Sequence, residues 1–215
     1  SDGNFEKAVE FLREKGLAAA AKKAGRIAAE GMVYAVADNA KKVGVVLEVN
    51  AETDFVAKND MFKDFVKNVA NVIMEQNPAD VDALLNCSME GSTVDAALKE
   101  KILVIGENIK IRRFTRFEGH CAAYIHAGGT HAVLVAFETS DEIAANPAFE
   151  ACGKDVCMQI AAVNPTYVRE SDVPAAVVEE EKKILLAQIE SDPKNANKPA
   201  QVKEKMITGK IGKFY

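Results

Sequence analysis

The chain has 215 residues, of which 48% are hydrophobic and 27% charged, and this composition excludes a disordered, fibrous or collagen-like protein. The length suffices for one large domain or two small ones with a sizeable core. With 27 basic and 32 acidic residues, the formal net charge is -5, so nucleic acid is not the expected partner. No apolar run reaches the roughly 18 residues that cross a bilayer, and no signal-peptide pattern opens the chain, so no membrane partner is expected either.

The cysteines and histidines lack the spacings of a metal site. The four cysteines, Cys87, Cys121, Cys152 and Cys157, form no CxxC pair, and the three histidines have no HExxH spacing. Both patterns argue against zinc. We therefore expect reduced, buried, structural thiols in a cytoplasmic protein that needs no metal and no cofactor.

Residues 1–30 are predicted to be a helical segment ahead of the core. Phe5, Val9 and Leu12 recur at helical spacing, Gly16 is placed to end that helix, and an alanine-rich helical stretch follows from Leu17 to Glu30. A single amphipathic helix has little to pack on at the start of a chain. It either docks on the body of the protein or is the last helix of a small helical domain, and we favour the second interpretation.

After Gly31 the period becomes strand-like. Two valine-rich runs, Met32 to Ala37 and Val43 to Asn50, flank a polar turn and predict a hairpin. One long helix is then predicted from Thr53-Asp54 to Asn77-Pro78, because the residue before proline is disfavoured in a helix. Its apolar positions are Phe55, Phe62, Phe65, Val66, Val69, Val72 and Ile73.

This hairpin-and-helix pattern occurs twice, since Gly31 to Pro78 aligns with Gly119 to Pro165 nearly without gaps. The matched pairs include Asp54 with Asp141, Asn59 with Asn146, Phe62 with Phe149, and Asn77-Pro78 with Asn164-Pro165. The repeat predicts an α+β fold with two similar subdomains, each a small antiparallel sheet packed with helices. We place these subdomains at 31–118 and 119–215.

The second subdomain carries an insertion. A helical pattern at 177–189, a polar stretch at 191–199 and a second helical pattern at 200–207 predict a helical hairpin over about 177–207. Its run of glutamates and lysines is typical of a solvated helix face. A module that dimerises through this hairpin is one of the functional readings left open, so a homodimer stays among the candidate partners.

Each subdomain is expected to close with a strand. In the first, Gly106 opens a turn into a strand that runs from Ile109 to Phe117. In the second, Gly209 is expected to lead through 210–214 into the corresponding strand, and the chain stops at Tyr215, where that strand would begin. The second sheet is therefore expected to be incomplete, with an unpaired edge.

Enzyme signatures such as a P-loop or a GxSxG elbow are absent. Three histidines and two glutamates do lie close in sequence: His120, His126, His131, Glu118 and Glu138. Because His126 and His131 flank Gly128-Gly129, however, they are typical of a hairpin turn. A small-molecule-binding or enzymatic protein with a site near His126 and Glu118, between the subdomains, is kept as the alternative.

The repeat singles out Thr53-Asp54-Phe55-Val56, whose counterpart is Ser140-Asp141-Glu142-Ile143. A hydroxyl residue and an aspartate before a helix suit N-capping, worth about 1 kcal/mol, so capping and function explain Asp54 equally well. Glu142 suits the first helical turn, whereas an aromatic residue gains nothing there. Phe55 either folds back or is displayed, and displayed aromatics are frequent binding anchors. A binding role requires Phe55 to be exposed.

Four stretches resemble the elongation factor Ts family, which comprises guanine nucleotide exchange factors of the translation GTPase elongation factor Tu. They are Leu17 to Gly25, Leu47 to Lys58, Ile105 to Arg113 and Tyr124 to Gly129. The resemblance covers nearly the whole chain, and the Thr53–Val56 motif is highly specific in this context. It implies a cytoplasmic, bacterial-type exchange factor without bond-making chemistry of its own, with elongation factor Tu as partner.

The resemblance also implies the contact residues. These are Lys23, Thr53, Asp54, Phe55, Val56, His126, Ala127 and Gly128. The Asp54-Phe55 pair would intrude beside the magnesium and phosphate site of the GTPase, while the second subdomain would approach a β-barrel domain. Family members have further sequence before about Asp2 and after Tyr215, which implies a fragment trimmed at both ends. Thr130-His131-Ala132 stands where members often have Arg-Ile-Gly, so contacts around that turn are expected to differ.

Overall fold

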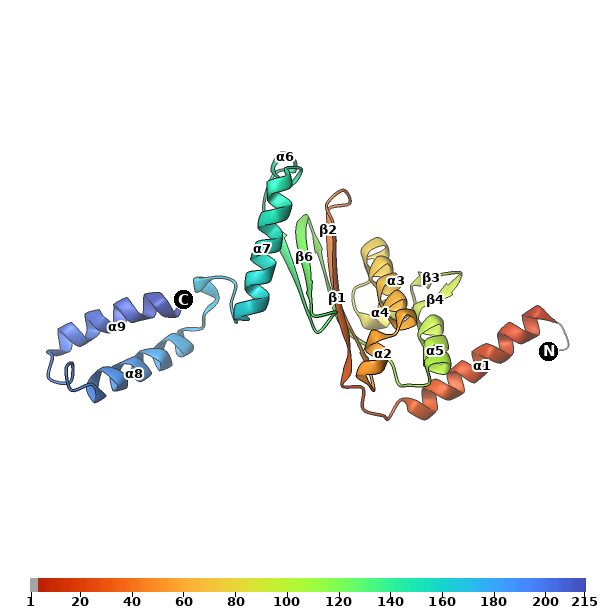
Figure 1. The fold of residues 1–215 in the computed structure, drawn as a ribbon, viewed down its shortest axis with the longest axis horizontal. Helices are drawn as coiled ribbons and strands as arrows, with labels where there is room; N and C mark the ends of the chain where they lie inside the picture. Colours follow the sequence, from red (N-terminus) through yellow and green to blue (C-terminus); the bar gives the residue numbers. More distant parts are fainter. Residues whose placement is uncertain (1–3) are drawn as a thin grey trace. The chain divides into compact units, whose positions relative to one another are not determined.

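An antiparallel sheet organises the first part of the chain in the computed structural model, which describes residues 4–215 (Figure 1). Its strands are β1 (Glu30–Asp38), β2 (Val43–Ala51) and β5 (Lys110–Glu118), with β2 in the centre. The predicted hairpin is thus confirmed. Its turn is closed by Asp38, whose Oδ1 accepts hydrogen bonds of 3.0 Å from the backbone N–H groups of Ala40 and Lys41. A short side-chain acceptor of this kind is a common reason for aspartate in turns.

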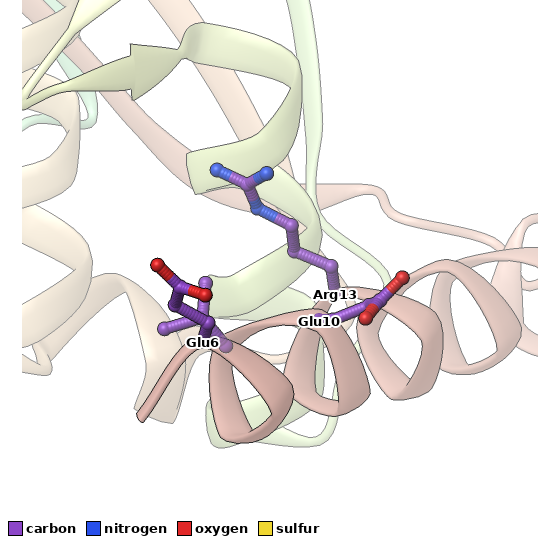
Figure 2. A pocket seen from close by; sticks show the side chains of 4 residues that line it. Glu6, Glu10 and Arg13 are labelled. Carbon is purple, nitrogen blue, oxygen red and sulfur yellow. The ribbon is translucent and has the colours of Figure 1, made fainter. Parts of the chain in front are cut away.

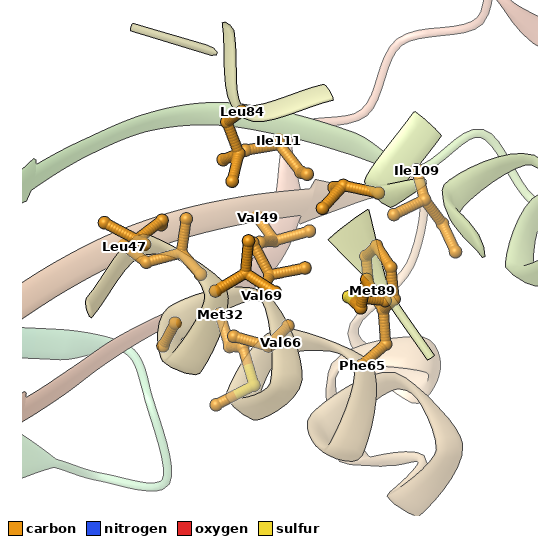
Figure 3. Packing of buried hydrophobic residues seen from close by; sticks show 14 of the residues in the cluster. Met32, Leu47, Val49, Phe65, Val66, Val69, Leu84, Met89, Ile109 and Ile111 are labelled. Atoms are coloured by element: carbon orange, nitrogen blue, oxygen red, sulfur yellow. The ribbon is translucent and has the colours of Figure 1, made fainter. Parts of the chain in front are cut away.

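Two consecutive helices, α2 (Asp54–Lys58) and α3 (Asp60–Gln76), follow β2, and α3 covers one face of the sheet. Alternate residues of β2 meet the apolar stripe of α3 in a buried cluster that includes Leu47, Val49, Phe65, Val66 and Val69 (Figure 3). The prediction of one unbroken helix is wrong at Asn59. This residue leaves the helical conformation and accepts a 2.8 Å hydrogen bond from Met61 N, so it caps α3.

The connection from α3 to β5 contains α4 (Val81–Leu85), the short strands β3 (Ser88–Met89) and β4 (Ser92–Thr93), and α5 (Val94–Ile105). Helix α1 (Phe5–Lys23) packs against α5. The predicted break at Gly16 is wrong, and so is the predicted helix up to Glu30. Gly16 lies buried inside α1, where the helix packs against α5. A Cβ at this position would lie 3.5 Å from Lys99 O, an ordinary van der Waals contact. The predicted start near Asp2 lies outside the described residues.

The second copy begins with the hairpin of β6 (His120–His126) and β7 (His131–Phe137), followed by α6 (Asp141–Ala144) and α7 (Pro147–Val163). Figure 1 shows α7, this hairpin, the β1–β2–β5 sheet and α3 as successive layers. The hairpin packs closely on β2 at Gly44, where a Cβ would lie 2.7 Å from Leu134 Cδ1. Within residues 4–215 this second sheet has two strands, one fewer than the first sheet.

The repeat is visible in the backbone. Gly31 and Gly119 both have positive φ, at 128° and 108°. Asn146 accepts a hydrogen bond from Ala148 N, as Asn59 does from Met61 N. The two copies therefore share a hairpin, a short helix and an asparagine-capped longer helix, which confirms the α+β class with small sheets packed by helices.

By its internal packing the chain divides into two units, one up to Val163 and one from Asn164 to Tyr215. The second unit contains a 3-10 turn, η1 (Glu170–Asp172), and the helices α8 (Ala175–Ser191) and α9 (Ala200–Phe214), which pack together. The expected turn into a strand over 210–214 is wrong, because α9 continues through these residues. A strand needs a neighbour to satisfy its backbone groups, whereas a helix satisfies them internally. We keep the three-part division at residues 30 and 118 as a proposal.

The cysteines are free, but not all are buried. Cys121 and Cys157 are buried, and this burial raises the pKa of both thiols. Cys87 is half-buried and Cys152 is exposed, so the prediction of four buried thiols is wrong for Cys152. Gly153 and Cys157 lie on the buried stripe of α7, and Cys152 precedes Gly153 by one residue, which turns it off that stripe. None of the described helices is both long and apolar enough to cross a membrane.

Candidate functional site

The turn between β2 and α2 displays an aromatic side chain. Phe55 is 79% exposed, as a binding role requires, although it lies in the first turn of α2. Its neighbour Val56 is only 7% exposed and packs into the core. The two-residue link of Glu52 and Thr53, both half-buried, joins this turn to the end of β2. Phe55 is therefore an exposed ring on a turn that is anchored on both sides.

Asp54 is exposed beside Phe55 and is kept negatively charged. Its Oδ2 accepts a 2.7 Å hydrogen bond from Lys58 Nζ, one helical turn along α2. That hydrogen bond, together with the charge of the ammonium group, holds the pKa of the Asp54 carboxyl below its ordinary value. The turn thus presents a carboxylate next to an apolar ring.

A carboxylate from a distant part of the chain holds the link that precedes this turn. Glu107, between α5 and β5, accepts hydrogen bonds from the backbone N–H of Glu52 at 3.1 Å and of Thr53 at 3.0 Å. Its other oxygen accepts a 2.7 Å bond from the Thr53 hydroxyl. These bonds fix the path of the backbone up to Asp54.

The capping interpretation fails for the first copy and holds for the second. Thr53 occupies the N-cap position of α2 without a side-chain capping bond, and its hydroxyl donates to Glu107. Ser140 does cap α6, accepting a 3.3 Å bond from Ile143 N. N-capping therefore does not explain Thr53, although the sequence pattern is the same in both copies.

The second predicted contact is the tip of the β6–β7 hairpin. His126 pairs with His131 across the turn, as the sequence predicts, and His126, Ala127 and Gly128 are all exposed. The His126 ring is oriented by a 2.9 Å hydrogen bond between its Nδ1 and the Tyr124 hydroxyl. Positive φ at Ala127 and Gly128, 47° and 69°, produces the tight reversal that exposes the tip.

The register of the strands brings the two predicted contacts to the same end of the first sheet. Gly129 O accepts a 2.8 Å hydrogen bond from Val33 N, which docks the hairpin tip on β1. Val33 pairs with Glu48 near the end of β2, and the Phe55 turn follows that end after two residues. The Phe55 turn and the hairpin tip therefore lie on one side of the first unit.

Lys23 is placed differently. Its Nζ donates a 3.2 Å hydrogen bond to Ile102 O in the last turn of α5, and the residue is half-buried. A cation there interacts favourably with the carbonyl end of the helix dipole. In the free protein this lysine ties the end of α1 to α5.

The alternative site near His126 and Glu118 gains little support. His120 is buried and its Nε2 lies 2.8 Å from Asp141 Oδ1, so its role is an internal contact. No group of three or more potential metal ligands occurs among residues 4–215. One hollow of ≈ 360 Å³ is lined by Glu6, Val9, Glu10 and Arg13, all on α1, and Figure 2 shows Arg13 extending away from the helix between the two glutamates. A second, of ≈ 240 Å³, lies between residues 165–173 and the last two residues of the chain.

Sequence reasoning missed Glu107 and its neighbour Asn108. Both lie in the Ile105 to Arg113 stretch, where they were interpreted as a turn into a strand. Their contacts join residues more than fifty positions apart, since Glu107 meets Thr53 and Asn108 N donates a 2.6 Å bond to Glu52 Oε1. The signal available was a pair of acidic residues, Glu52 and Glu107, each beside a strand end.

Comparison with known proteins agrees with the motifs. A family model described as "Elongation factor TS" matches residues 52–215. The chain is 47% identical to elongation factor Ts of Symbiobacterium thermophilum, covering 99% of this chain and 68% of that protein. It is 46% identical to elongation factor Ts of Trichlorobacter lovleyi and 45% identical to that of Clostridium perfringens, covering 100% of this chain and 70% of each relative. The chain therefore belongs to the elongation factor Ts family of translation elongation factors.

Proposed function

We propose that this chain is a guanine nucleotide exchange factor that accelerates GDP release from elongation factor Tu in the cytoplasm. The observation that carries the proposal is the 79% exposed ring of Phe55, on a turn anchored by buried Val56 and by Glu107. An exposed aromatic on a fixed turn buries a large area on binding at a small entropy cost. Membership of the elongation factor Ts family supports the choice of partner.

The mechanism requires no bond-making by this chain. In translation GTPases bound GDP is held by backbone N–H groups and a bridging Mg²⁺. In the proposal, the Phe55 ring acts as a wedge beside that site, and the charged Asp54 carboxylate is brought near the cation and the phosphates. Coupling between the two ligands is reciprocal, so a factor that weakens GDP binding is itself released when nucleotide returns. The factor therefore speeds exchange without consuming anything.

The hairpin tip supplies a second contact in this proposal. His126, Ala127 and Gly128 are exposed at the same end of the sheet as Phe55, which lets one partner engage both segments. The resemblance to the family implies that this position faces the partner, and a second point of attachment would fix the orientation of the wedge. Lys23 could join that interface only by leaving its bond to Ile102 O.

Stopped-flow release of a fluorescent GDP from elongation factor Tu tests the proposal. We expect Phe55→Ala to lower the release rate by about 30-fold or more, as for the loss of a contact worth about 2 kcal/mol in the transition state for release. The matched control is Glu142→Ala, which truncates the exposed residue at the same position of the second copy and should leave the rate within about twofold. Equal rates for wild type and Phe55→Ala would refute the proposal.

A further inference from the structure

The link between β2 and α2 lies beyond the strand ladder. The last ladder pair of β1 and β2 is Glu30 with Ala51, so the next N–H groups, those of Glu52 and Thr53, have no strand partner across β1. The Glu107 carboxylate accepts from both of them and from the Thr53 hydroxyl, at 2.7 to 3.1 Å. An ionised carboxylate has two acceptor oxygens and no donor, which suits three converging donors.

We call these bonds, together with those that Glu52 makes in return, the clamp between Glu107 and Glu52, because each carboxylate holds the segment of the other. While Glu107 holds the Glu52–Thr53 link, Glu52 Oε1 accepts a 2.6 Å hydrogen bond from Asn108 N. Asn108, which is buried, donates in turn from Nδ2 to Arg26 O at 2.8 Å. Arg26 Nη1 lies 3.4 Å from Glu52 Oε1 and completes the network. Two two-residue segments, one before α2 and one before β5, thus fix each other through their carboxylates.

The second copy provides an internal comparison without the clamp. Its hydroxyl residue, Ser140, caps its own helix α6. In the repeat, the position of Glu107 corresponds to Lys210, which lies within α9 of the other unit. In the second copy, which has Glu142 in place of Phe55, the turn is therefore capped by its own Ser140. In the first copy, which displays the aromatic ring, Glu107 from another part of the chain holds the link before the turn.

We infer that Glu107 is a positioning residue that holds the Asp54-Phe55 turn in its binding-competent form before a partner arrives; this inference rests on the proposed exchange function. Ordering the two-residue link during binding would cost backbone conformational entropy, and we expect that cost to appear as about a tenfold loss of rate. Glu107 removes that cost by fixing the link in the free protein, which is preorganisation in the usual sense.

The test compares Glu107→Ala, Glu107→Gln and Glu100→Ala in the GDP-release assay, at factor concentrations below saturation. Glu107→Ala should slow release about tenfold. Glu107→Gln should stay within about threefold of wild type, because its amide oxygen still accepts from the link and its amide group can donate to the Thr53 hydroxyl. Glu100→Ala removes an exposed carboxylate of α5 and should have no effect.

Two further measurements separate positioning from general destabilisation. Amide hydrogen exchange at Glu52 and Thr53 should accelerate in Glu107→Ala and remain slow in Glu107→Gln. In a Phe55→Ala background, Glu107→Ala should slow release by less than about twofold, because it acts through the ring. Thr53→Val removes only the hydroxyl bond, and should slow release about threefold even if Glu107→Ala does not fold.

The outcomes distinguish this inference from the proposed function. If Phe55→Ala slows release while Glu107→Ala and Thr53→Val do not, the positioning role is wrong and the exchange function stands. If Glu107→Ala slows the Phe55→Ala protein as much as it slows wild type, Glu107 acts elsewhere and the inference is also wrong. If Phe55→Ala itself has no effect, the proposed function fails whatever Glu107 does.

Discussion

The two strand-to-helix turns of the repeat share a sequence pattern and use it in opposite ways. In the second copy, Asp141 accepts hydrogen bonds from Lys42 Nζ at 2.8 Å and faces His120 Nε2 at 2.8 Å. Lys42 belongs to the β1–β2 turn, so this aspartate ties the second copy to the first. In the first copy, Asp54 pairs with Lys58 of its own helix.

The difference shows how a duplicated motif can divide its tasks. A second set of bonds joins the same regions, since Asn39 and Cys121 exchange hydrogen bonds and Gly119 N donates to Lys42 O. The turn of the second copy therefore serves to join the two copies. In the first copy, Glu107 holds the link that precedes the turn, and Asp54 and Phe55 remain exposed to solvent. A partner can therefore contact both side chains.

The largest expected effect concerns the cores behind the two turns. Phe62 is fully buried under the first sheet, whereas its counterpart in the repeat, Phe149, is half-buried. The ring of Phe149 packs edge-on against Phe137, with 5.2 Å between the ring centroids. We expect Phe62→Ala to lower the free energy of unfolding by about 3–5 kcal/mol, and Phe149→Ala by roughly half of that. Urea unfolding followed by circular dichroism measures both. Equal losses would mean that the two cores contribute alike.

A reciprocal swap of the displayed residues sharpens the comparison. We expect Phe55→Glu to slow GDP release by about 30-fold or more, and Glu142→Phe to change it by less than about twofold. The double swap should remain as slow as Phe55→Glu, because Asp141 is held by Lys42 and His120 and cannot take over from Asp54. Recovery of exchange in the double swap would show that the two turns are interchangeable.

A smaller effect is expected at Lys23. Because its ammonium group donates to Ile102 O, Lys23→Ala should lower the free energy of unfolding by about 0.5–1 kcal/mol. Lys22→Ala removes an exposed lysine of the same helix and is the matched control, with no expected change. Thermal unfolding of the two variants makes this comparison. If Lys23→Ala keeps full stability but slows exchange, its interface role outweighs its internal bond.

The smallest effect is the acid sensitivity of the two aspartates. The hydrogen bond from Lys42 and then that from His120 hold the pKa of Asp141 below its ordinary value, and Lys58 does the same for Asp54. The pKa of an aspartate in the unfolded chain is about 3.9. When its pKa in the folded protein is lower, the ionised carboxylate raises the free energy of unfolding at pH values above about 3.9. This stability is lost as the pH falls through the folded-state pKa.

Thermal unfolding between pH 2 and pH 6 measures this contribution in Asp54→Ala and Asp141→Ala. Both variants should lose part of the acid dependence of wild type, and both changes should be small because the two carboxylates are exposed. Asp54→Ala should slow exchange and Asp141→Ala should not. A slower exchange rate in Asp141→Ala alone would reverse the roles assigned to the two turns.

The elements predicted from sequence are those with a local cause. The β1–β2 hairpin follows from valine-rich runs around a polar turn. The contrast with Glu142 singled out Phe55 but left open whether the ring folds back or is displayed, and the structure displays it. The break at Asn59 was missed because asparagine, apart from its role as a cap, is compatible with a helical pattern. The turn into a strand expected over 210–214 is wrong, because a strand depends on a neighbour that the periodicity cannot supply.

The part of the site that sequence could not supply is the clamp. Its bonds join Thr53 to Glu107 and Asn108 to Glu52, across more than fifty residues. Nothing local distinguishes Glu107 from a solvated turn residue. Likewise, Thr53 and Ser140 look equivalent as helix caps, and only the tertiary contact of Thr53 with Glu107 separates them.

The central claim is that Phe55 acts on bound nucleotide and is more than a point of attachment. The most direct measurement is the rate of GDP release from elongation factor Tu over a range of factor concentrations, for wild type and Phe55→Ala. A wedge predicts that the maximal rate falls by about 30-fold while the half-saturating concentration changes by less than about threefold. An unchanged maximal rate, with a raised half-saturating concentration, would contradict the account and reduce Phe55 to an anchor.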